Sequence, residues 1–121
     1  MSDKIKFTIY GQPYSKANSR RLVMIKGKPR FIKSKQALNY SKDFLLQCPK
    51  QKTLIPKCQD VSVGIKIYYS SRRPDLDESL ILDLMQGIIY ENDRSVKEKH
   101  ITWGLDKEKP RAEVEVSVIR V

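Results

Sequence analysis

A segment in the middle of the chain sets the strongest limit on the fold. Residues 61–69, VSVGIKIYY, carry an apolar or aromatic side chain at every second position. A period of two places these side chains on one face of a β-strand, which must then be covered by a hydrophobic layer. The segment therefore predicts a strand with one buried face, and residues 70–74, SSRRP, end it.

Other segments show weaker strand patterns. Strands are predicted over residues 5–9, 22–25, 30–32, 100–103 and 112–121. Residues 26–29, KGKP, predict the turn of a basic hairpin, because glycine adopts the backbone angles that such turns require. Residues 107–111 predict the turn before the last strand.

Apolar residues at helical spacing predict two helices. We expect Ser34 to cap a helix over residues 35–48, which Pro49 ends. The expected buried face of this helix carries Ala37, Ser41, Phe44, Leu45 and Cys48. A shorter helix is predicted over residues 78–86, with Asp77 as its N-cap and Gly87 at its C-terminal end.

Length and element order together indicate one domain. The chain has 121 residues, 40% of them hydrophobic, with 5 Gly and 6 Pro, which excludes a disordered tail and a fibrous repeat. The order β-ββ-α-β-α-β-β indicates an α+β domain over residues 1–121, with a mixed, largely antiparallel sheet and two main helices. No apolar run approaches the roughly 20 residues that span a bilayer, and no signal peptide is recognisable. We expect a cytoplasmic protein without a membrane partner.

The charge is distributed unevenly. Residues 1–58 hold 14 Lys or Arg against 2 acidic residues, a net charge of +12, whereas residues 59–121 hold 10 against 12, a net charge of −2. Basic residues can simply keep a small domain soluble, but their clustering favours a nucleic acid as the partner. The residues expected to bind DNA are Lys16, Arg20, Arg21, Lys28, Arg30, Lys33, Arg72 and Arg73.

Acidic residues gather in the second half of the chain. Asp75 and Asp77 are two residues apart, so in an extended segment their carboxylates point to the same side. Asp93 follows the short helix and can approach them only if the strand after it lies beside the strand over residues 61–69. Since the chain has 2 Cys, not in CxxC spacing, and a single His, a zinc cluster is excluded. Carboxylate oxygens alone favour Mg²⁺ or Mn²⁺.

Three of the acidic residues also have a purely structural interpretation. Asp77 can serve only as a helix cap, Asp93 only as a turn residue, and Asp83 only as a solvated residue at the rim of the helix. A pair of aspartates separated by one residue is by itself a weak signal for a metal.

Several segments in a fixed order carry a more specific signal. The chain contains Arg73-Pro-Asp75-Leu-Asp77, then a helix with Asp83 ahead of Gly87, then Tyr90-Glu-Asn-Asp93-Arg-Ser-Val96. Two further segments precede them. They are Gly11-Gln-Pro13-Tyr-Ser-Lys16, and the stretch in which the predicted strand at Arg30-Phe-Ile-Lys33 leads into the predicted helix as far as Tyr40. Taken together, the ordered set resembles the RusA family of Holliday-junction resolvases and covers most of the chain.

The resemblance implies a function and a site. A member of this family is expected to be a homodimeric, Mg²⁺-dependent endodeoxyribonuclease of bacterial or phage type, with Mn²⁺ able to substitute and no small-molecule cofactor. It binds four-way or branched DNA and nicks two opposed strands symmetrically. Carried over by position, Asp75, Asp77 and Asp93 are the metal-binding catalytic acids. Asp83, in the matched helix, is a supporting candidate, and Arg94 and Lys97 are supporting candidates because they are close in sequence.

The chain departs from the family pattern in three places. Glu78 stands where the family usually has Asn, and Asn92 stands before Asp93 where the family has a second Asp. The family lysine that follows the acid pair is absent, so another cation must supply its charge or activity is reduced. Candidates close in sequence are Arg73, Arg94, Lys97 and Lys99. The alternative is a catalytically impaired module of the same fold that binds branched DNA, or RNA, without cleaving it.

Overall fold

The computed structural model describes residues 4–13 and 20–119. Its elements are β1 (Lys4–Tyr10), β2 (Arg20–Ile25), β3 (Lys28–Lys33), α1 (Lys35–Gln47), β4 (Val61–Tyr69), α2 (Ser79–Met85), the 3₁₀ helix η1 (Asp93–Ser95), β5 (Val96–Leu105) and β6 (Arg111–Val118). The predicted α+β class is confirmed. Within the described residues, no helix has both the length and the apolar character that crossing a membrane requires.

The main sheet has four strands in the order β1-β6-β4-β5. β6 pairs antiparallel with both β1 and β4, whereas β4 and β5 are parallel. The sheet is therefore mixed and largely antiparallel, as predicted. β4 lies in the interior of the sheet, and its alternating side chains from Val61 to Tyr69 are buried. This explains why its sequence pattern is the clearest in the chain.

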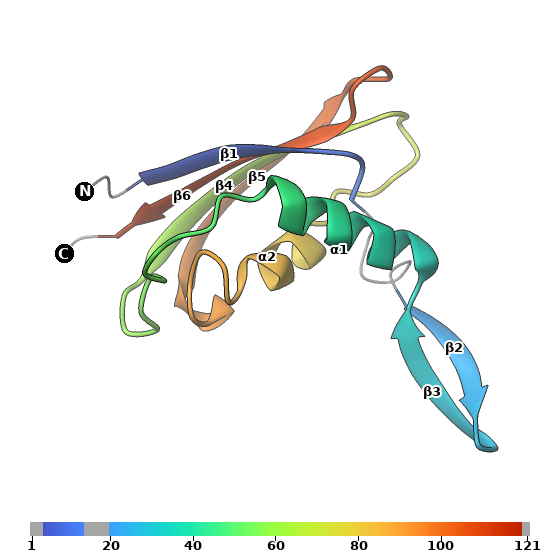
Figure 1. Cartoon of the computed structure of the whole chain (residues 1–121). Helices are drawn as coiled ribbons and strands as arrows, with labels where there is room; N and C mark the ends of the chain where they lie inside the picture. Colours follow the sequence, from blue (N-terminus) through green and yellow to red (C-terminus); the bar gives the residue numbers. More distant parts are fainter. Residues whose placement is uncertain (1–3, 14–19, 120–121) are drawn as a thin grey trace.

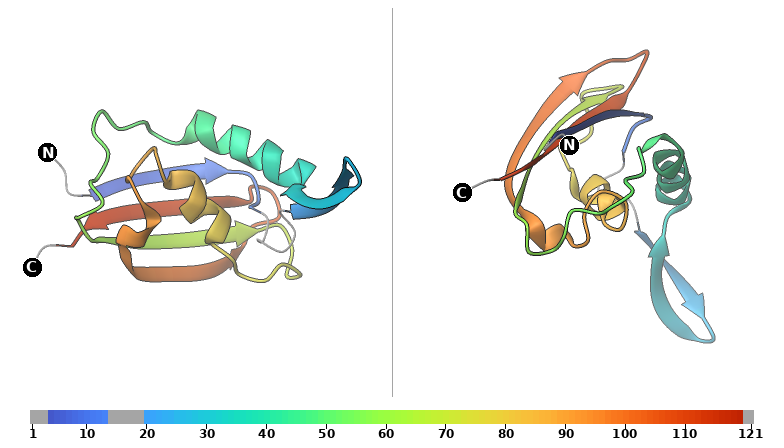
Figure 2. Two further views of the ribbon diagram at one scale, coloured as in Figure 1. Left: turned by 90° about the horizontal axis from the view of Figure 1, so that it is seen from below. Right: turned by 60° about the vertical axis from the view of Figure 1, so that its left-hand side comes forward.

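Both helices cover the same face of the sheet (Figures 1 and 2). The buried residues of α1 are Ala37, Tyr40, Ser41 and Phe44, and those of α2 are Leu80, Ile81 and Met85. The expectation that Leu45 is buried is wrong, since it is 46% exposed. Tyr40 lies on the buried stripe instead, because it is one helical turn from Ala37 and from Phe44.

Both helices are slightly shorter than predicted, since α1 ends at residue 47 rather than 48 and α2 covers residues 79–85 rather than 78–86. The Ser34 hydroxyl accepts a hydrogen bond from the Ala37 amide at 3.2 Å, and α1 ends before Cys48 and Pro49. The N-cap of α2 is Glu78 rather than Asp77. The Asp77 carboxylate nevertheless accepts from the Ser79 amide at 2.9 Å, so it satisfies an amide at the start of the helix as an N-cap would.

The hairpin of β2 and β3 projects away from the rest of the fold (Figure 1). Its turn is Lys26-Gly27, with φ of 52° and 76°, which is shorter than the predicted turn over residues 26–29. These left-handed angles suit the tight turns that match the twist of a hairpin. In the described part of the chain, the two strands form a separate sheet that pairs with no other strand.

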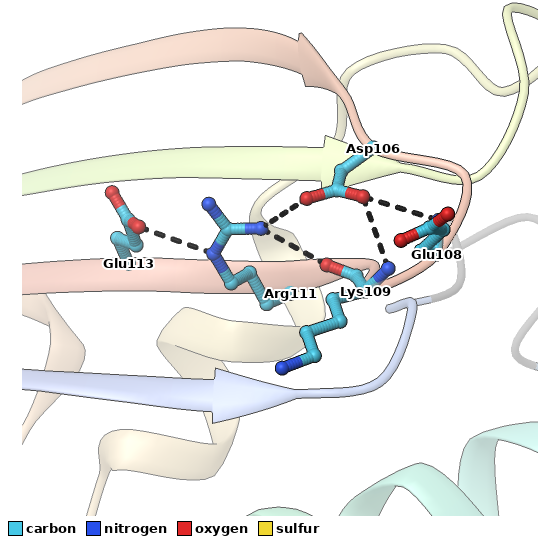
Figure 3. Close-up of polar contacts among 5 residues, drawn as sticks. All are labelled: Asp106, Glu108, Lys109, Arg111 and Glu113. Atoms are coloured by element: carbon cyan, nitrogen blue, oxygen red, sulfur yellow. Dashed lines mark hydrogen bonds and ion pairs between the residues drawn. The ribbon is translucent and has the colours of Figure 1, made fainter.

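The turn between β5 and β6 is fixed by polar contacts, shown in Figure 3. The Arg111 guanidinium donates to the Asp106 carboxylate at 2.7 Å and to the Lys109 carbonyl at 3.0 Å, and it lies 3.9 Å from the centre of the Tyr68 ring. The Lys109 amide and Arg111 hold the pKa of Asp106 below its usual range. Because β5 ends at Leu105 and β6 begins at Arg111, the turn covers residues 106–110, one residue earlier than the predicted 107–111.

Buried tyrosines predict a loss of stability in alkali. Burial raises the pKa of the Tyr40 and Tyr90 hydroxyls far above the ordinary value of 10.0. Above about pH 10 these hydroxyls ionise in the unfolded chain but stay protonated in the fold. Their contribution to the free energy of unfolding is therefore fully present below that pH. Above it, the free energy of unfolding falls by up to about 1.4 kcal/mol per pH unit for each tyrosine. Urea denaturation between about pH 8 and about pH 11 measures this dependence.

Tyr40→Phe provides the comparison for this titration. Within the described residues the buried Tyr40 hydroxyl has no hydrogen-bond partner, so its removal is expected to preserve the fold. The variant should show a smaller alkaline loss than wild type. Identical pH dependence of the two proteins would contradict the assignment.

Candidate active site

The loop that follows β4 turns back along the edge of β5. The Trp103 indole N–H donates to the Pro74 carbonyl at 3.3 Å, and the Lys99 ammonium contacts the Glu78 carboxylate at 3.0 Å. From Pro74 to Glu78 the loop advances four residues, while its partners on β5 go back four residues, from Trp103 to Lys99. The loop therefore runs antiparallel to β5. This path brings the start of α2 to the middle of the strand.

Asp75 and Asp77 lie on this loop next to the Tyr69 hydroxyl. That hydroxyl donates to the Asp75 carbonyl at 3.2 Å and accepts from the Asp77 amide at 3.3 Å. Burial and the charges of Asp77, Glu78 and Asp75 raise the pKa of the Tyr69 hydroxyl. The Asp75 side chain is exposed and that of Asp77 is half-buried, with the Asp77 carboxylate directed at the Ser79 amide.

Asp93 lies beside α2 and is held by contacts other than those of the loop that carries Asp75 and Asp77. It begins η1, and its amide donates to the Gln86 side chain at 2.8 Å. The Asn92 side chain accepts from the Arg94 amide at 2.9 Å, so Asn92 caps this short helix. The replacement of the family Asp by Asn92 therefore keeps an oxygen acceptor at the cap.

A cavity of about 200 Å³ lies between α2 and β5. Its lining residues are Ser79, Leu82, Asp83, Asp93, Val96 and Lys99. Asp83 and Asp93 thus line the same cavity, although the sequence predicted only a supporting role for Asp83. The charges of Asp93 and Asp83 also raise the pKa of the buried Tyr90 hydroxyl, after burial itself.

The strand condition for bringing the acids together is met, since β5 lies parallel beside β4. The full convergence is not seen: among the described residues, no group of three His, Cys, Asp or Glu side chains is close enough to hold one metal ion. Asp75 and Asp77 are not among the residues that line the cavity, and the Asp77 carboxylate is engaged at the helix start. The two carboxylates that line the cavity, those of Asp83 and Asp93, fit Mg²⁺, because Mg²⁺ uses one or two carboxylates together with water and phosphate oxygens.

The basic candidates near the acids differ in position. All four are exposed, but Lys99 lines the cavity, whereas Arg73, Arg94 and Lys97 are not among its lining residues. Lys99 was named from the sequence only for its proximity to Asp93. The register of β5 against the acidic loop is what sets it apart, and no pattern in the sequence gives that register.

The residues expected to bind DNA fall in two regions. Arg20, Arg21, Arg30 and Lys33 belong to the strands of the hairpin, and Lys28 is exposed at its tip. Arg72 and Arg73 are exposed on the acidic loop, with the Arg72 guanidinium 6.0 Å from the centre of the Trp103 ring. Lys16 lies outside the described residues.

Comparison with known proteins gives one clear result. The family model described as endodeoxyribonuclease RusA matches residues 11–117. A search of curated proteins gives no match. The matched range covers nearly the whole chain and includes Asp75, Asp77 and Asp93. The chain therefore belongs to the RusA family of Holliday-junction-resolving endonucleases.

Proposed function

We propose that this chain is an Mg²⁺-dependent, structure-selective endodeoxyribonuclease that resolves four-way DNA junctions by paired symmetric nicks. The observation that carries the proposal is the cavity lined by Asp83, Asp93 and Lys99, beside the helix that follows Asp75 and Asp77. Carboxylates for a hard cation and an ammonium group for a phosphate are adjacent there.

Asp75, Asp77 and Asp93 are the proposed metal-binding and catalytic residues. Asp83 is a further carboxylate, which lines the cavity together with Asp93. The ion would lower the pKa of an attacking water and offset charge on the scissile phosphate. The carboxylates of this chain would bind it, and Mn²⁺ would substitute because it accepts the same oxygen ligands. The Asp77 carboxylate would exchange the Ser79 amide for the ion.

Lys99 is proposed to supply the cation that the family places after the acid pair. It is the one basic residue among those that line the cavity. Its side chain is 47% exposed, so the ammonium group can reach a phosphate that enters from solvent, while Glu78 holds it at 3.0 Å. Glu78 would thus position the lysine where the family has a neutral residue.

DNA binding and symmetry are assigned to the basic residues and to a dimer. The hairpin residues, with Arg72 and Arg73 beside the acids, would bind the backbone of branched DNA. Symmetric nicks on opposed strands require two active sites related by a two-fold axis, which a homodimer supplies. Analytical ultracentrifugation is expected to give a dimer with one junction, and a monomer bound to the junction would contradict this assignment.

A cleavage assay tests the main proposal. Purified protein is expected to cut a synthetic four-way junction with Mg²⁺ or Mn²⁺, to remain inactive with a chelator, and to leave linear duplex of the same sequence intact. Comparison with a three-way junction separates junction resolution from general cleavage of branched DNA.

The same assay decides the alternative of a non-cleaving binding module. This alternative is favoured by the lack of three converging carboxylates among the described residues. It predicts binding that is sensitive to salt and indifferent to divalent metal. Tight junction binding without cleavage, under both metals and across pH, would establish the alternative and overturn the enzymatic proposal.

A further inference from the structure

Tyr69 lies at the end of β4 and contacts both acids of the loop through their backbone. Its side chain is buried, and its hydroxyl is the donor to the Asp75 carbonyl and the acceptor for the Asp77 amide. A single oxygen atom thus spans the two residues whose carboxylates the proposed function uses. Residues 72–78 form no helix or strand, so such contacts decide the path of the loop.

Trp103 adds a second support on the neighbouring strand. Its ring stacks on Tyr69, with centroids 5.9 Å apart and an interplanar angle of 25°, and its indole N–H donates to the Pro74 carbonyl. The two aromatic residues therefore belong to paired strands and hold consecutive peptide groups of one loop. In the turn that follows β5, the Asp106 amide donates to the Tyr69 carbonyl at 2.8 Å.

We propose that Tyr69 is a positioning residue for metal binding: its hydroxyl, supported by Trp103, holds the backbone of Asp75 and Asp77 so that their carboxylates are presented to one ion. The inference rests on the proposed function. A ligand pair held in advance loses less conformational freedom on binding, and residues that orient metal ligands typically contribute 10–100-fold to affinity or activity.

Tyr69→Phe isolates the hydroxyl. The variant retains the ring and its stacking on Trp103 but leaves the Asp77 amide and the Asp75 carbonyl without this partner. We expect hydrogen exchange of the Asp77 amide, measured by NMR without metal, to become about fivefold faster, the effect of losing one net hydrogen bond. Junction binding without metal should not change, because the basic residues are intact.

Metal binding is measured with Mn²⁺ alone, through the fluorescence of Trp103. The chain has one tryptophan, which contacts the loop directly, so quenching by Mn²⁺ reports on this site. The midpoint of the Mn²⁺ titration is expected to rise about tenfold in Tyr69→Phe. Cleavage should fall at low Mn²⁺ and return to the wild-type rate at saturating Mn²⁺, a rescue that a general structural defect would not show.

Tyr40→Phe is the matched control. It also removes a buried tyrosine hydroxyl, but this hydroxyl, unlike that of Tyr69, has no hydrogen-bond partner among the described residues. Unchanged exchange at the Asp77 amide in Tyr69→Phe would overturn the hydroxyl contact itself. Faster exchange with an unchanged Mn²⁺ midpoint would overturn its role in metal binding. Absence of Mn²⁺ quenching in wild type would instead overturn the proposed function, whatever the exchange data show.

Discussion

Asp75→Asn is expected to abolish junction cleavage and to leave junction binding intact. Asn has the same shape but lacks the charge, so a divalent cation loses a ligand while the backbone contact of residue 75 with Tyr69 is kept. A bound metal contributes several kcal/mol of transition-state stabilisation, so its loss should lower kcat by about 10³-fold or more. Single-turnover cleavage and a gel-shift titration measure the two properties separately.

Asp43→Asn is the control for the change in charge. Asp43 is exposed on α1, far along the chain from the acidic loop, and the substitution removes one carboxylate in the same way. It should leave kcat unchanged, and both variants should melt close to the wild-type temperature, since Asp75 is itself exposed. Cleavage by Asp75→Asn at more than about a tenth of the wild-type rate would contradict the assignment of Asp75.

Asp75 is preferred to Asp77 for this experiment because of a structural ambiguity. The Asp77 carboxylate accepts from the Ser79 amide at the start of α2, so Asp77→Asn alters a helix cap as well as a charge. The two effects would both lower activity. At Asp75 no helix boundary is involved, and the result concerns the charge alone.

The sequence predicted the sheet best where one face of a strand is buried. β4 alternates because its neighbours on both sides leave one face for the helices and one for solvent. β5 is an edge strand, and its residues 97–100 are all exposed, so no alternation marks its beginning. This explains why the strand was predicted from His100 and in fact begins at Val96.

The site was predicted in part. Asp75, Asp77 and Asp93 stand at motif positions that a linear pattern can identify, and they remain predictions as catalytic residues. Lys99 and Tyr69 could not be selected from the sequence, because their relation to the acids depends on the parallel register of β4 and β5 and on the path of the loop. Tertiary pairing of this kind leaves no local sequence signal.

Lys99→Gln is expected to lower kcat by 10²–10³-fold, about the loss that follows removal of one donor to a developing negative charge. The side chain keeps most of its length and its polarity but loses the charge. Junction affinity should change little, since Lys99 is one cation among 24 Lys and Arg. Lys97→Gln removes the same charge two residues away, outside the cavity lining, and is expected to retain the wild-type kcat.

The ion pair with Glu78 offers the sharper comparison. If Lys99 only neutralises Glu78, whose side chain is 18% exposed, the double variant Lys99→Gln/Glu78→Gln contains no unpaired charge and should recover activity. If Lys99 acts on the phosphate, the double variant stays as slow as Lys99→Gln. In that case Glu78→Gln alone should remain active, because it leaves the ammonium group in place. We expect the second pattern, and recovery of cleavage by the double variant would assign Lys99 to the fold alone.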